Sequence, residues 1–267
     1  MNNINPDDLL PDELKKYIID SSKEWFAEDG EQHRVLKLSK GRKIRKIYIV
    51  NHSKKSKLVQ LIPYLEDTLK KIDKTNVNYA FQKGKNCSLG AMNHIGYKYT
   101  ISFDLVNFFD SVRKSHVEGI LDNEVINFCF IDDAPRQGLP TSPLIATIAF
   151  LKCDQLIIDY IKKNKIDAVY TRYADDLIFS FNNIQDRGKI TFLVDKATEA
   201  NNFKINTNKT KFQNSRNGMR IITGLAVDNF GVHPTRKTKR KIRAARHQYN
   251  LPSLDGLIEW AKCKLPN

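Results

Sequence analysis

The stretch that decides the fold is residues 169–181, which read VYTRYADDLIFSF. β-Branched, aromatic and apolar residues lie on both sides of Ala174-Asp175-Asp176, a pattern typical of two strands joined by a tight turn. Adjacent carboxylates at the tip of an apolar hairpin are costly unless a cation neutralises them. Asp is also a common turn residue, so an isolated pair would indicate only a solvated turn. The function of Asp175 and Asp176 therefore depends on whether the chain supplies a third acid, a nucleotide pocket and a nucleic-acid surface.

A third acid lies in residues 99–112, YTISFDLVNFFDSV, which read as a buried strand leading into a turn. Asp104 falls within the apolar run, and acids are rarely buried without a partner, although an N-cap or a salt bridge would also explain it. If this strand neighbours the 169–181 hairpin, three carboxylates converge. Like charges that close need divalent cations, and oxygen ligands favour Mg²⁺. Two such ions about 4 Å apart serve in-line phosphoryl transfer, so the pattern predicts nucleotidyl-transfer chemistry.

Other segments predict the surroundings of this site. Residues 34–50 alternate around a Gly-containing turn and carry many cations, which predicts a β-hairpin that either binds phosphates or is an edge hairpin protected by lysines. Residues 134–143, APRQGLPTSP, form a rigid turn before a helix expected over 144–162. We expect one or two helices within 6–27, further helices at 58–72, 189–201 and 254–260, a strand and loop at 203–212, and a strand at 220–227. His94 is expected to be a structural hydrogen-bonding residue.

The charge of the chain indicates a polyanionic partner. The 267 residues carry 44 Lys and Arg against 30 Asp and Glu, a formal net charge of +14. Such a balance favours nucleic acid first and an anionic membrane surface second. Seven of the eleven residues from Arg236 to Arg246 are basic with no acid between them, which favours a phosphate-tracking helix face over a solvated charge run.

Nothing in the sequence indicates a membrane protein or a secreted one. No run of about 18 apolar residues is present, and the first residues lack the pattern of a signal peptide. The four cysteines are far apart, as expected of reduced thiols in the cytoplasm and not of a zinc site or a disulfide framework. We therefore expect a cytoplasmic protein without a membrane partner.

Three motifs in this order resemble those of reverse transcriptases, specifically the bacterial retron and group II intron-like branch. FDLVNFFD (103–110) resembles the first catalytic motif of the family, QGLPTSP (137–143) its Gln-Gly-x-Pro-x-Ser-Pro motif, and YADD (173–176) its Tyr-x-Asp-Asp box. The resemblance runs from about residue 34 to the C-terminus. The retron branch fits best, because Ile222-Thr223-Gly224 is similar to its Val-Thr-Gly element. Residues 90–94, GAMNH, resemble its Asn-Ala-x-x-His element, with Gly90 in place of the Asn.

The resemblance implies roles for individual residues. Asp104 and Asp175 would be the main ligands of two Mg²⁺ ions, with Asp176 beside them and the Leu105 carbonyl assisting. Phe109 takes the position of an aromatic gate that excludes a ribose 2′-OH, so dNTPs would be preferred. The other residues expected to bind the dNTP are Gln137, Gly138, Lys40 (or Lys37, given the uncertain hairpin register), Arg45 and, near the leaving pyrophosphate, Lys209. The residues expected to contact nucleic acid are Lys83, Tyr173, Lys239, Arg240, Lys241, Arg243 and Arg246.

The fold implied is an α+β right-hand polymerase with fingers, a palm and a short basic helical thumb. We expect N-terminal helices and fingers at residues 1–98, the palm at 99–224 with a finger-proximal insertion at 113–150, and the thumb at 225–267. The alternation of strand and helix patterns between 99 and 227 is consistent with such a palm. The implied partners are dNTPs, a cognate structured non-coding RNA, and the short cDNA that stays linked to this RNA (msDNA). An accessory effector protein in anti-phage defence is implied as well.

Two alternatives remain open. Because Gly90 departs from the retron element, the chain is alternatively another stand-alone defence-associated or intron-derived reverse transcriptase with a different priming mode. From a different class, it is a basic RNA-binding protein whose polymerase site has decayed. The intact Asp104, Asp175, Asp176, Gln137 and Phe109 argue against this last reading.

Overall fold

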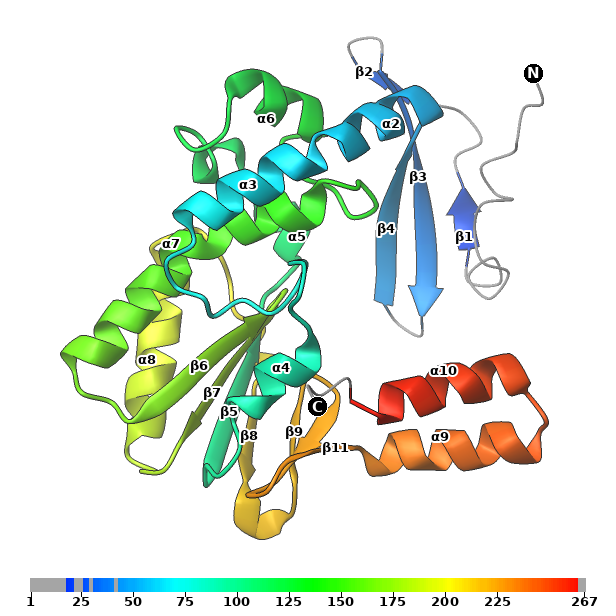
Figure 1. Cartoon of the computed structure of the whole chain (residues 1–267). Coiled ribbons are helices and arrows are strands. Elements are labelled where there is room, and N and C mark those ends of the chain that lie inside the picture. The colour runs from blue at the N-terminus through cyan, green and yellow to red at the C-terminus, as the bar shows by residue number, and fades with distance from the viewer. Residues whose placement is uncertain (1–17, 22–25, 29–30, 41–42, 264–267) are drawn as a thin grey trace. The chain divides into compact units, whose positions relative to one another are not determined.

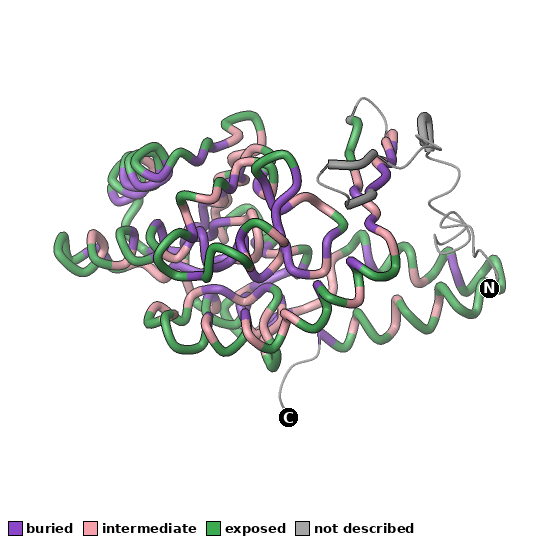
Figure 2. The backbone as a smooth tube through the Cα atoms, turned by 90° about the horizontal axis from the view of Figure 1, so that it is seen from above, coloured by how far each residue is buried: buried purple, intermediate pink, exposed green. Residues whose placement is uncertain are grey.

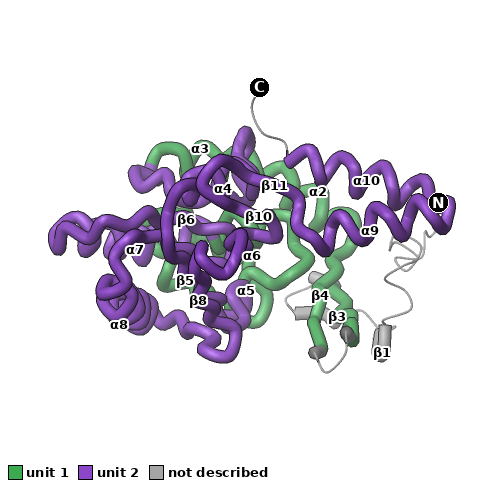
Figure 3. The backbone as a smooth tube through the Cα atoms, turned by 90° about the horizontal axis from the view of Figure 1, so that it is seen from below, with its two compact units in different colours: residues 1–71, 112–146 green, residues 72–111, 147–267 purple. Residues whose placement is uncertain are grey.

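The chain divides into two compact units, described separately below (Figure 3). The computed structural model describes residues 18–21, 26–28, 31–40 and 43–263. Unit 1 comprises residues 1–71 and 112–146, and unit 2 comprises residues 72–111 and 147–267. The predicted borders between fingers, palm and thumb, after residues 98 and 224, stay a prediction. No helix in the described ranges is long and apolar enough to cross a membrane.

Unit 1 contains a sheet built around one long strand. Strand β3 (Glu31–Lys40) pairs antiparallel with β4 (Lys43–Val50), from His33↔Val50 to Lys40↔Lys43. This pairing confirms the hairpin predicted at residues 34–50. The unit also contains α2 (His52–Gln60), α3 (Ile62–Ile72), the 3₁₀ helix η2 (Lys114–His116) and α6 (Asn123–Cys129). Pro63 lies in the first turn of α3, where its missing N–H is not needed.

The helices predicted over residues 6–27 are wrong where the structure describes this segment. Ile18–Ser21 forms strand β1 and Phe26–Glu28 forms strand β2, and both pair antiparallel with β3. Pairing with β3 gives the backbone N–H and C=O groups of these residues their hydrogen-bond partners in a sheet. This tertiary pairing outweighs the helical spacing of the apolar residues in the sequence. The remainder of the predicted helical region, except Phe26 and Ala27, lies outside the described residues.

Unit 2 is organised around a four-stranded antiparallel sheet. Its strands are β5 (Tyr99–Asp104), β6 (Ala168–Tyr173), β7 (Asp176–Phe181) and β8 (Lys211–Asn214), in the order β6-β7-β5-β8 (Figure 1). Helices α7 (Ser142–Lys163) and α8 (Asp186–Glu199) cover one face, called the back face here. Phe103 and Phe179 pack edge to face there, with ring centroids 5.9 Å apart. Apolar side chains thus alternate toward the helices along each strand, as a half-covered sheet requires.

The opposite, front face of the sheet is only partly covered. Two groups of elements pack on part of this face. They are helix α4 (Cys87–Met92) and a small sheet of β9 (Arg220–Ile222), β10 (Leu225–Val227) and β11 (Val232–Pro234). A buried apolar cluster joins them to the four-stranded sheet through Ile178. Figure 2 marks the buried stretches of the backbone in purple. The single strand predicted over 220–227 is therefore two strands. Thr223 and Gly224, with φ of +45° and +83°, make the tight turn between β9 and β10.

The remaining elements of unit 2 are short helices and a C-terminal helix pair. They are α5 (Phe108–Ser111), the 3₁₀ helices η3 (Thr207–Lys209) and η4 (Ser215–Asn217), α9 (Arg236–His247) and α10 (Leu251–Ala261). Helices α9 and α10 pack against each other as a hairpin (Figure 1). Thr235 caps α9 by accepting a hydrogen bond from the Thr238 N–H, so the predicted basic helix forms with its cations exposed.

A buried ion pair crosses the back face between β6 and α7. The guanidinium of Arg172 donates two hydrogen bonds to Asp154 Oδ2, at 3.0 and 2.7 Å, and both side chains are fully buried. Arg172 Nε also donates to Asp154 Oδ1 at 3.1 Å, and the Tyr170 hydroxyl donates to the same oxygen at 2.7 Å. Burial alone would lower the pKa of Arg172, but the adjacent Asp154 outweighs burial and raises it. The pair stays charged because each partner supplies what water would otherwise provide.

We predict that Arg172→Met destabilises the protein by about 3–5 kcal/mol, because it leaves the carboxylate of Asp154 buried without a counter-ion. The double variant Arg172→Met/Asp154→Leu should recover most of that loss, because no unpaired charge remains. Urea unfolding of the three proteins measures the difference. Equal stability of the single and double variants would contradict this account of the pair.

Candidate active site

The register of β5 and β7 brings two of the predicted catalytic acids together. Asp104 ends β5 and pairs directly with Asp176, which begins β7. Because side chains alternate along a strand, both carboxylates stand on the front face. Asp175 lies in the turn between β6 and β7, where its carbonyl accepts a hydrogen bond from the Leu105 N–H at 3.0 Å. The strands that carry the acids are thus neighbours, the condition on which the predicted convergence rests.

The turn itself is conformationally strained and supported from behind. Ala174 has a φ of +55°, which residues with a Cβ rarely adopt. Its carbonyl accepts a hydrogen bond from Arg172 at 3.4 Å, from the same guanidinium that binds Asp154. The buried ion pair therefore reaches the backbone of the turn that carries Asp175.

Lys209 neutralises one of the two acids. Its ammonium lies 2.5 and 2.6 Å from the two carboxylate oxygens of Asp104. The lysine is held at the end of η3, whose preceding residue Asn206 donates its N–H to the Asp104 carbonyl at 2.7 Å. A charge-assisted contact to both oxygens is among the stronger hydrogen-bond arrangements in proteins. The structure thus joins Lys209 to Asp104, one of the predicted catalytic acids.

The carboxyl of Asp176 is the acid of this site whose ionisation is most clearly disfavoured. Burial, and then the neighbouring Asp175 and Asp104, raise its pKa to about 6, while Lys209 and Lys211 act in the opposite sense. A carboxyl that is difficult to ionise gains from a nearby cation, because added positive charge lowers the cost of the second negative charge.

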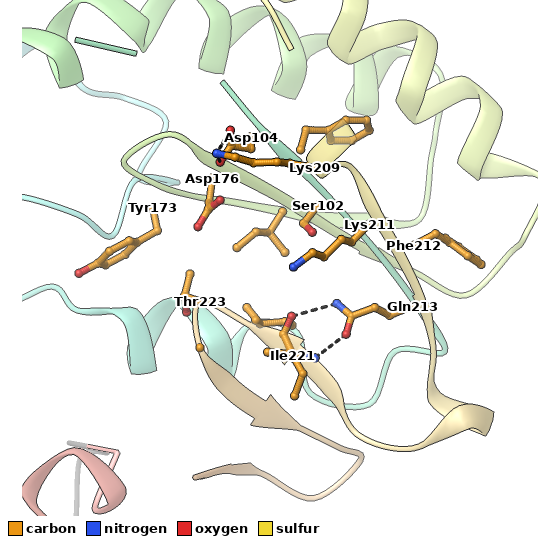
Figure 4. A pocket seen from close by; sticks show the side chains of 14 residues that line it. Ser102, Asp104, Tyr173, Asp176, Lys209, Lys211, Phe212, Gln213, Ile221 and Thr223 are labelled. Carbon is orange, nitrogen blue, oxygen red and sulfur yellow. Dashed lines mark hydrogen bonds and ion pairs between the residues drawn. The ribbon is translucent and has the colours of Figure 1, made fainter. Parts of the chain in front are cut away.

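A groove of about 660 Å³ opens in front of the acids (Figure 4). Asp104, Asp176 and Tyr173 line it together with Thr223 and Gly224. All of these residues belong to unit 2. The turn that resembles the retron Val-Thr-Gly element therefore borders the same groove as the Tyr-x-Asp-Asp turn.

The donor set suits a divalent cation, although the described residues contain no group of three His, Cys, Asp or Glu side chains close enough to form a metal site. Asp104 and Asp176 offer carboxylate oxygens on one face, and the Leu105 carbonyl stays a predicted ligand. Oxygen ligands are those that Mg²⁺ prefers. The raised pKa of Asp176 indicates negative charge that a cation would relieve.

The gate and one predicted nucleic-acid contact also lie in unit 2. Phe109 is partly buried in α5, with its ring centroid 6.3 Å from that of Phe81 and 5.8 Å from that of Phe108. These neighbours restrict the orientation of its ring. Lys83 is exposed in the loop before α4. The role of each residue stays a prediction.

Four residues predicted to bind the dNTP lie in unit 1. The Gln137 carbonyl accepts a hydrogen bond from the Tyr48 N–H at 2.8 Å, which fixes the loop before α7 on β4. Gly138, with φ of +113°, lies so close that an added Cβ would be 2.3 Å from the Tyr48 carbonyl oxygen, so only glycine fits. Arg45 is exposed on β4, and Lys40 ends β3. Their contact with a nucleotide stays a prediction.

The basic helix α9 presents its predicted contacts to solvent. Thr238 and Ala245 are buried, whereas the cations on the other faces of the helix are exposed. The exposed set includes Lys239, Arg240, Lys241, Arg243 and Arg246. The structure leaves these cations accessible, and their binding to phosphates stays a prediction.

Sequence reasoning did not identify the network that supports the site from the front. His94 is buried between Ser180 and Thr171, with ring nitrogens 2.8 and 2.7 Å from the two hydroxyls. Burial and the nearby Arg220 lower the pKa of His94 to about 3, so its ring is neutral at neutral pH. Arg220 NH2 donates to the His94 carbonyl at 2.7 Å and ties β9 to this network. The structural role predicted for His94 is confirmed.

Two further residues near the site, Arg172 and Lys211, were not predicted, although the sequence contains a hint for each. Arg172 stands within an apolar strand, and a cation there implies a buried acid, but Asp154 belongs to a helix that the sequence does not align with it. Lys211 follows Lys209 at an interval of two, which places both near the acids once β8 is known to pair with β5. Both signals need the three-dimensional pairing before they can be used.

Comparison with known proteins identifies the family. A family model described as "Reverse transcriptase (RNA-dependent DNA polymerase)" matches residues 38–242. The chain is 32% identical over 215 residues to the retron Ec73 reverse transcriptase of Escherichia coli, covering 70% of this chain and 68% of the relative. It is 27% identical over 224 residues to the retron Mx65 reverse transcriptase of Myxococcus xanthus, covering 70% of this chain and 51% of that relative. The chain thus spans about half to two thirds of these relatives.

A solved structure supports the fold. The telomerase of Candida albicans, solved with a fragment of telomeric RNA, superposes with a TM-score of 0.57 at 13% identity. The match covers 76% of this chain and 45% of that one. With the family match it confirms the predicted α+β polymerase fold. The chain belongs to the reverse transcriptase family, within its retron-type branch.

Proposed function

We propose that this chain is the RNA-directed DNA polymerase of a retron and that Asp104, Asp175 and Asp176 carry the reaction. The observation that carries the proposal is the direct cross-strand pair of Asp104 and Asp176 beside Lys209, in a chain of this family. Paired carboxylates at a groove, with a lysine in contact, form the arrangement that nucleotidyl transfer needs. Reverse transcriptases use divalent metals, and we propose two Mg²⁺ ions for this chain.

Each protein group has a distinct task in the proposed reaction. Bound Mg²⁺ ions would supply charge neutralisation at the attacking and leaving oxygens. Asp104 and Asp176 would supply carboxylate ligands from one face of the sheet, and Asp175 would join them from the turn whose backbone Arg172 supports. Lys209, which contacts Asp104 here, would donate to the leaving pyrophosphate after its ammonium leaves Asp104. Phe109 excludes nucleotides that carry a 2′-OH.

For the whole protein we propose a structured non-coding RNA as template and a short cDNA that remains linked to it. The relatives named as retron reverse transcriptases and the Thr223–Gly224 turn at the groove support this assignment. An effector protein acting with the product in anti-phage defence completes the proposal. Co-expression with the neighbouring non-coding DNA should yield short RNA-linked cDNA. Template-free or protein-primed products would instead favour another stand-alone reverse transcriptase.

We predict that Asp176→Asn abolishes Mg²⁺-dependent dNTP incorporation on a primed RNA template yet stabilises the metal-free protein at pH 7 by about 1–2 kcal/mol. The pKa of Asp176 in the folded protein, about 6, exceeds the ordinary value of 3.8, so the folded protein holds this proton more tightly than the unfolded chain does. The stability that this group contributes is therefore present below pH 4 and is lost as pH rises through 6. Asparagine removes this dependence.

Primer extension and chemical unfolding at pH 5 and pH 7 measure the two effects. Asp195→Asn, in the exposed part of α8, is the matched control and should change neither. If Asp176→Asn synthesised DNA at the rate of the unchanged protein, the assignment of the active site would be wrong.

The gate can be tested separately. Phe109→Val should raise the use of rNTPs relative to dNTPs by about 10-fold or more, because removing the ring removes its clash with the 2′-OH. Phe109→Tyr, which keeps a large ring, should retain the preference for dNTPs. Single-nucleotide incorporation kinetics with matched dNTP and rNTP pairs provide the measurement. An unchanged ratio for Phe109→Val would show that another group discriminates the sugar.

Binding of RNA phosphates by the basic face of α9 can be tested through the salt dependence of RNA binding. Replacing Arg240, Lys241 and Arg243 with Gln should weaken RNA binding and reduce the steepness of log K against log salt by about 0.7–0.9 unit for each lost phosphate contact. Fluorescence anisotropy of a labelled RNA over a series of salt concentrations gives the slope. A slope identical to that of the unchanged protein would mean that the helix face is only solvated.

A further inference from the structure

The second lysine of the groove has no assigned role. Lys211 pairs with Ser102 across β5 and β8, and Ser102 lies two residues before Asp104 on the same strand. Side chains two apart share a face, so Lys211 stands on the front face with the catalytic acids. Its position is two residues, or about 7 Å along the strand, from the end of β5 that carries Asp104.

The ammonium of Lys211 projects into the groove (Figure 4). Lys211 lines the same groove as Asp104 and Asp176. Lys209 binds both oxygens of Asp104, whereas the Lys211 side chain makes no ion pair or hydrogen bond within the described part of the chain. The groove therefore contains a cation that is close to the reaction centre and available for an anion.

The wall that carries Lys211 is fixed in place. Two residues further along β8, the Gln213 side chain donates to the Ile221 carbonyl at 2.9 Å and accepts from the Ile221 N–H at 2.7 Å. These two bonds tie β8 to β9, as the dashed lines of Figure 4 show. Lys211 thus projects from a strand paired with β5 on one side and held to β9 on the other. Because the backbone that carries Lys211 is held in place, its ammonium can bind an anion at a defined distance from the acids.

The geometry of the proposed reaction indicates which anion this is. In-line phosphoryl transfer sets the attacking and leaving oxygens on opposite sides of the transferred phosphorus. Lys209 lies at the sheet edge in contact with Asp104, where we place the leaving pyrophosphate. Lys211 lies on the edge strand β8, and Figure 4 shows its side chain on the side of the acids that faces Ile221 and Thr223. The strand that supplies the attacking 3′-OH belongs on this second side.

We propose that Lys211 binds the phosphodiester nearest the 3′ end of the strand being extended and so positions its 3′-OH. This inference rests on the proposed polymerase function, because it takes the attacking and leaving sides from that reaction. The ligand chemistry is a phosphate monoanion that accepts a charge-assisted hydrogen bond from the ammonium. The other source of phosphate in the reaction, the triphosphate of the nucleotide, is separated by the experiment below.

The test replaces the charge of one phosphate at a time. DNA primers on an RNA template carry a neutral methylphosphonate either at the 3′-terminal linkage or several linkages upstream. The proteins are the unchanged chain, Lys211→Gln, Lys211→Arg and the control Lys152→Gln, an exposed lysine of α7 on the opposite side of the sheet. Anisotropy without nucleotide gives the Kd of the primer–template, and extension kinetics give KM for primer and for dNTP.

We expect the terminal methylphosphonate to weaken primer binding by the unchanged chain about 10-fold, the size of one charge-assisted hydrogen bond. Lys211→Gln should show the same loss with the natural primer and no further loss with the terminal methylphosphonate, at an unchanged dNTP KM. Lys211→Arg and Lys152→Gln should keep the sensitivity of the unchanged chain.

Three outcomes overturn the proposal. The first is an unchanged chain that binds both modified primers equally well, and the second is a Lys211→Gln variant that keeps full sensitivity to the terminal linkage. The third is a raised dNTP KM with normal primer binding, which would assign Lys211 to the triphosphate. Failure of the polymerase function is distinct, because the unchanged chain would then not extend the unmodified primer at all.

Discussion

Two carboxylates that face each other across neighbouring strands are the constraint on which the rest of unit 2 depends. Like charges directly opposed in an antiparallel pair destabilise a sheet. Asp104 and Asp176 tolerate this position because Lys209 binds the first and because burial leaves the second difficult to ionise. The sheet beneath them is held by an apolar back face against α7 and α8. The packing of the apolar back face thus offsets the destabilisation caused by the two opposed carboxylates.

The turn between β6 and β7 needs a second kind of support. Ala174 adopts a left-handed conformation, and its carbonyl is bound by a guanidinium that is itself held by Asp154 in α7. On the other face, His94 and Arg220 link the middle of the sheet to β9 through hydroxyl groups and a backbone carbonyl. A neutral His94 ring suits this role, because two hydroxyl partners can satisfy one donor and one acceptor. Polar networks therefore fix the acids from both sides.

The amount that the sequence predicts depends on the range of the interaction. Alternation around Asp175-Asp176 and the apolar run around Asp104 predict the two strands correctly, because each signal is local. Residues 18–21 were predicted as helix, since helical spacing is visible in sequence and pairing with β3 is not. Residues 220–227 contain enough β-branched side chains to resemble one strand, although Thr223 and Gly224 form a turn. The partnership of Arg172 with Asp154 joins a strand to a helix, and no local pattern encodes it.

Gly90 shows how a departure from a motif can be compensated within the chain. A Cβ at this position would lie 3.1 Å from the ring of Tyr79, and the Asn93 amide donates to the hydroxyl of the same ring at 2.9 Å. The aromatic ring thus occupies space next to α4 that a larger residue at position 90 would need. Positions 79 and 90 are therefore expected to co-vary in evolution, a bulky ring at one accompanying glycine at the other. A motif that defines the retron subtype by position 90 alone would exclude this chain. A motif that considers positions 79 and 90 together would include it.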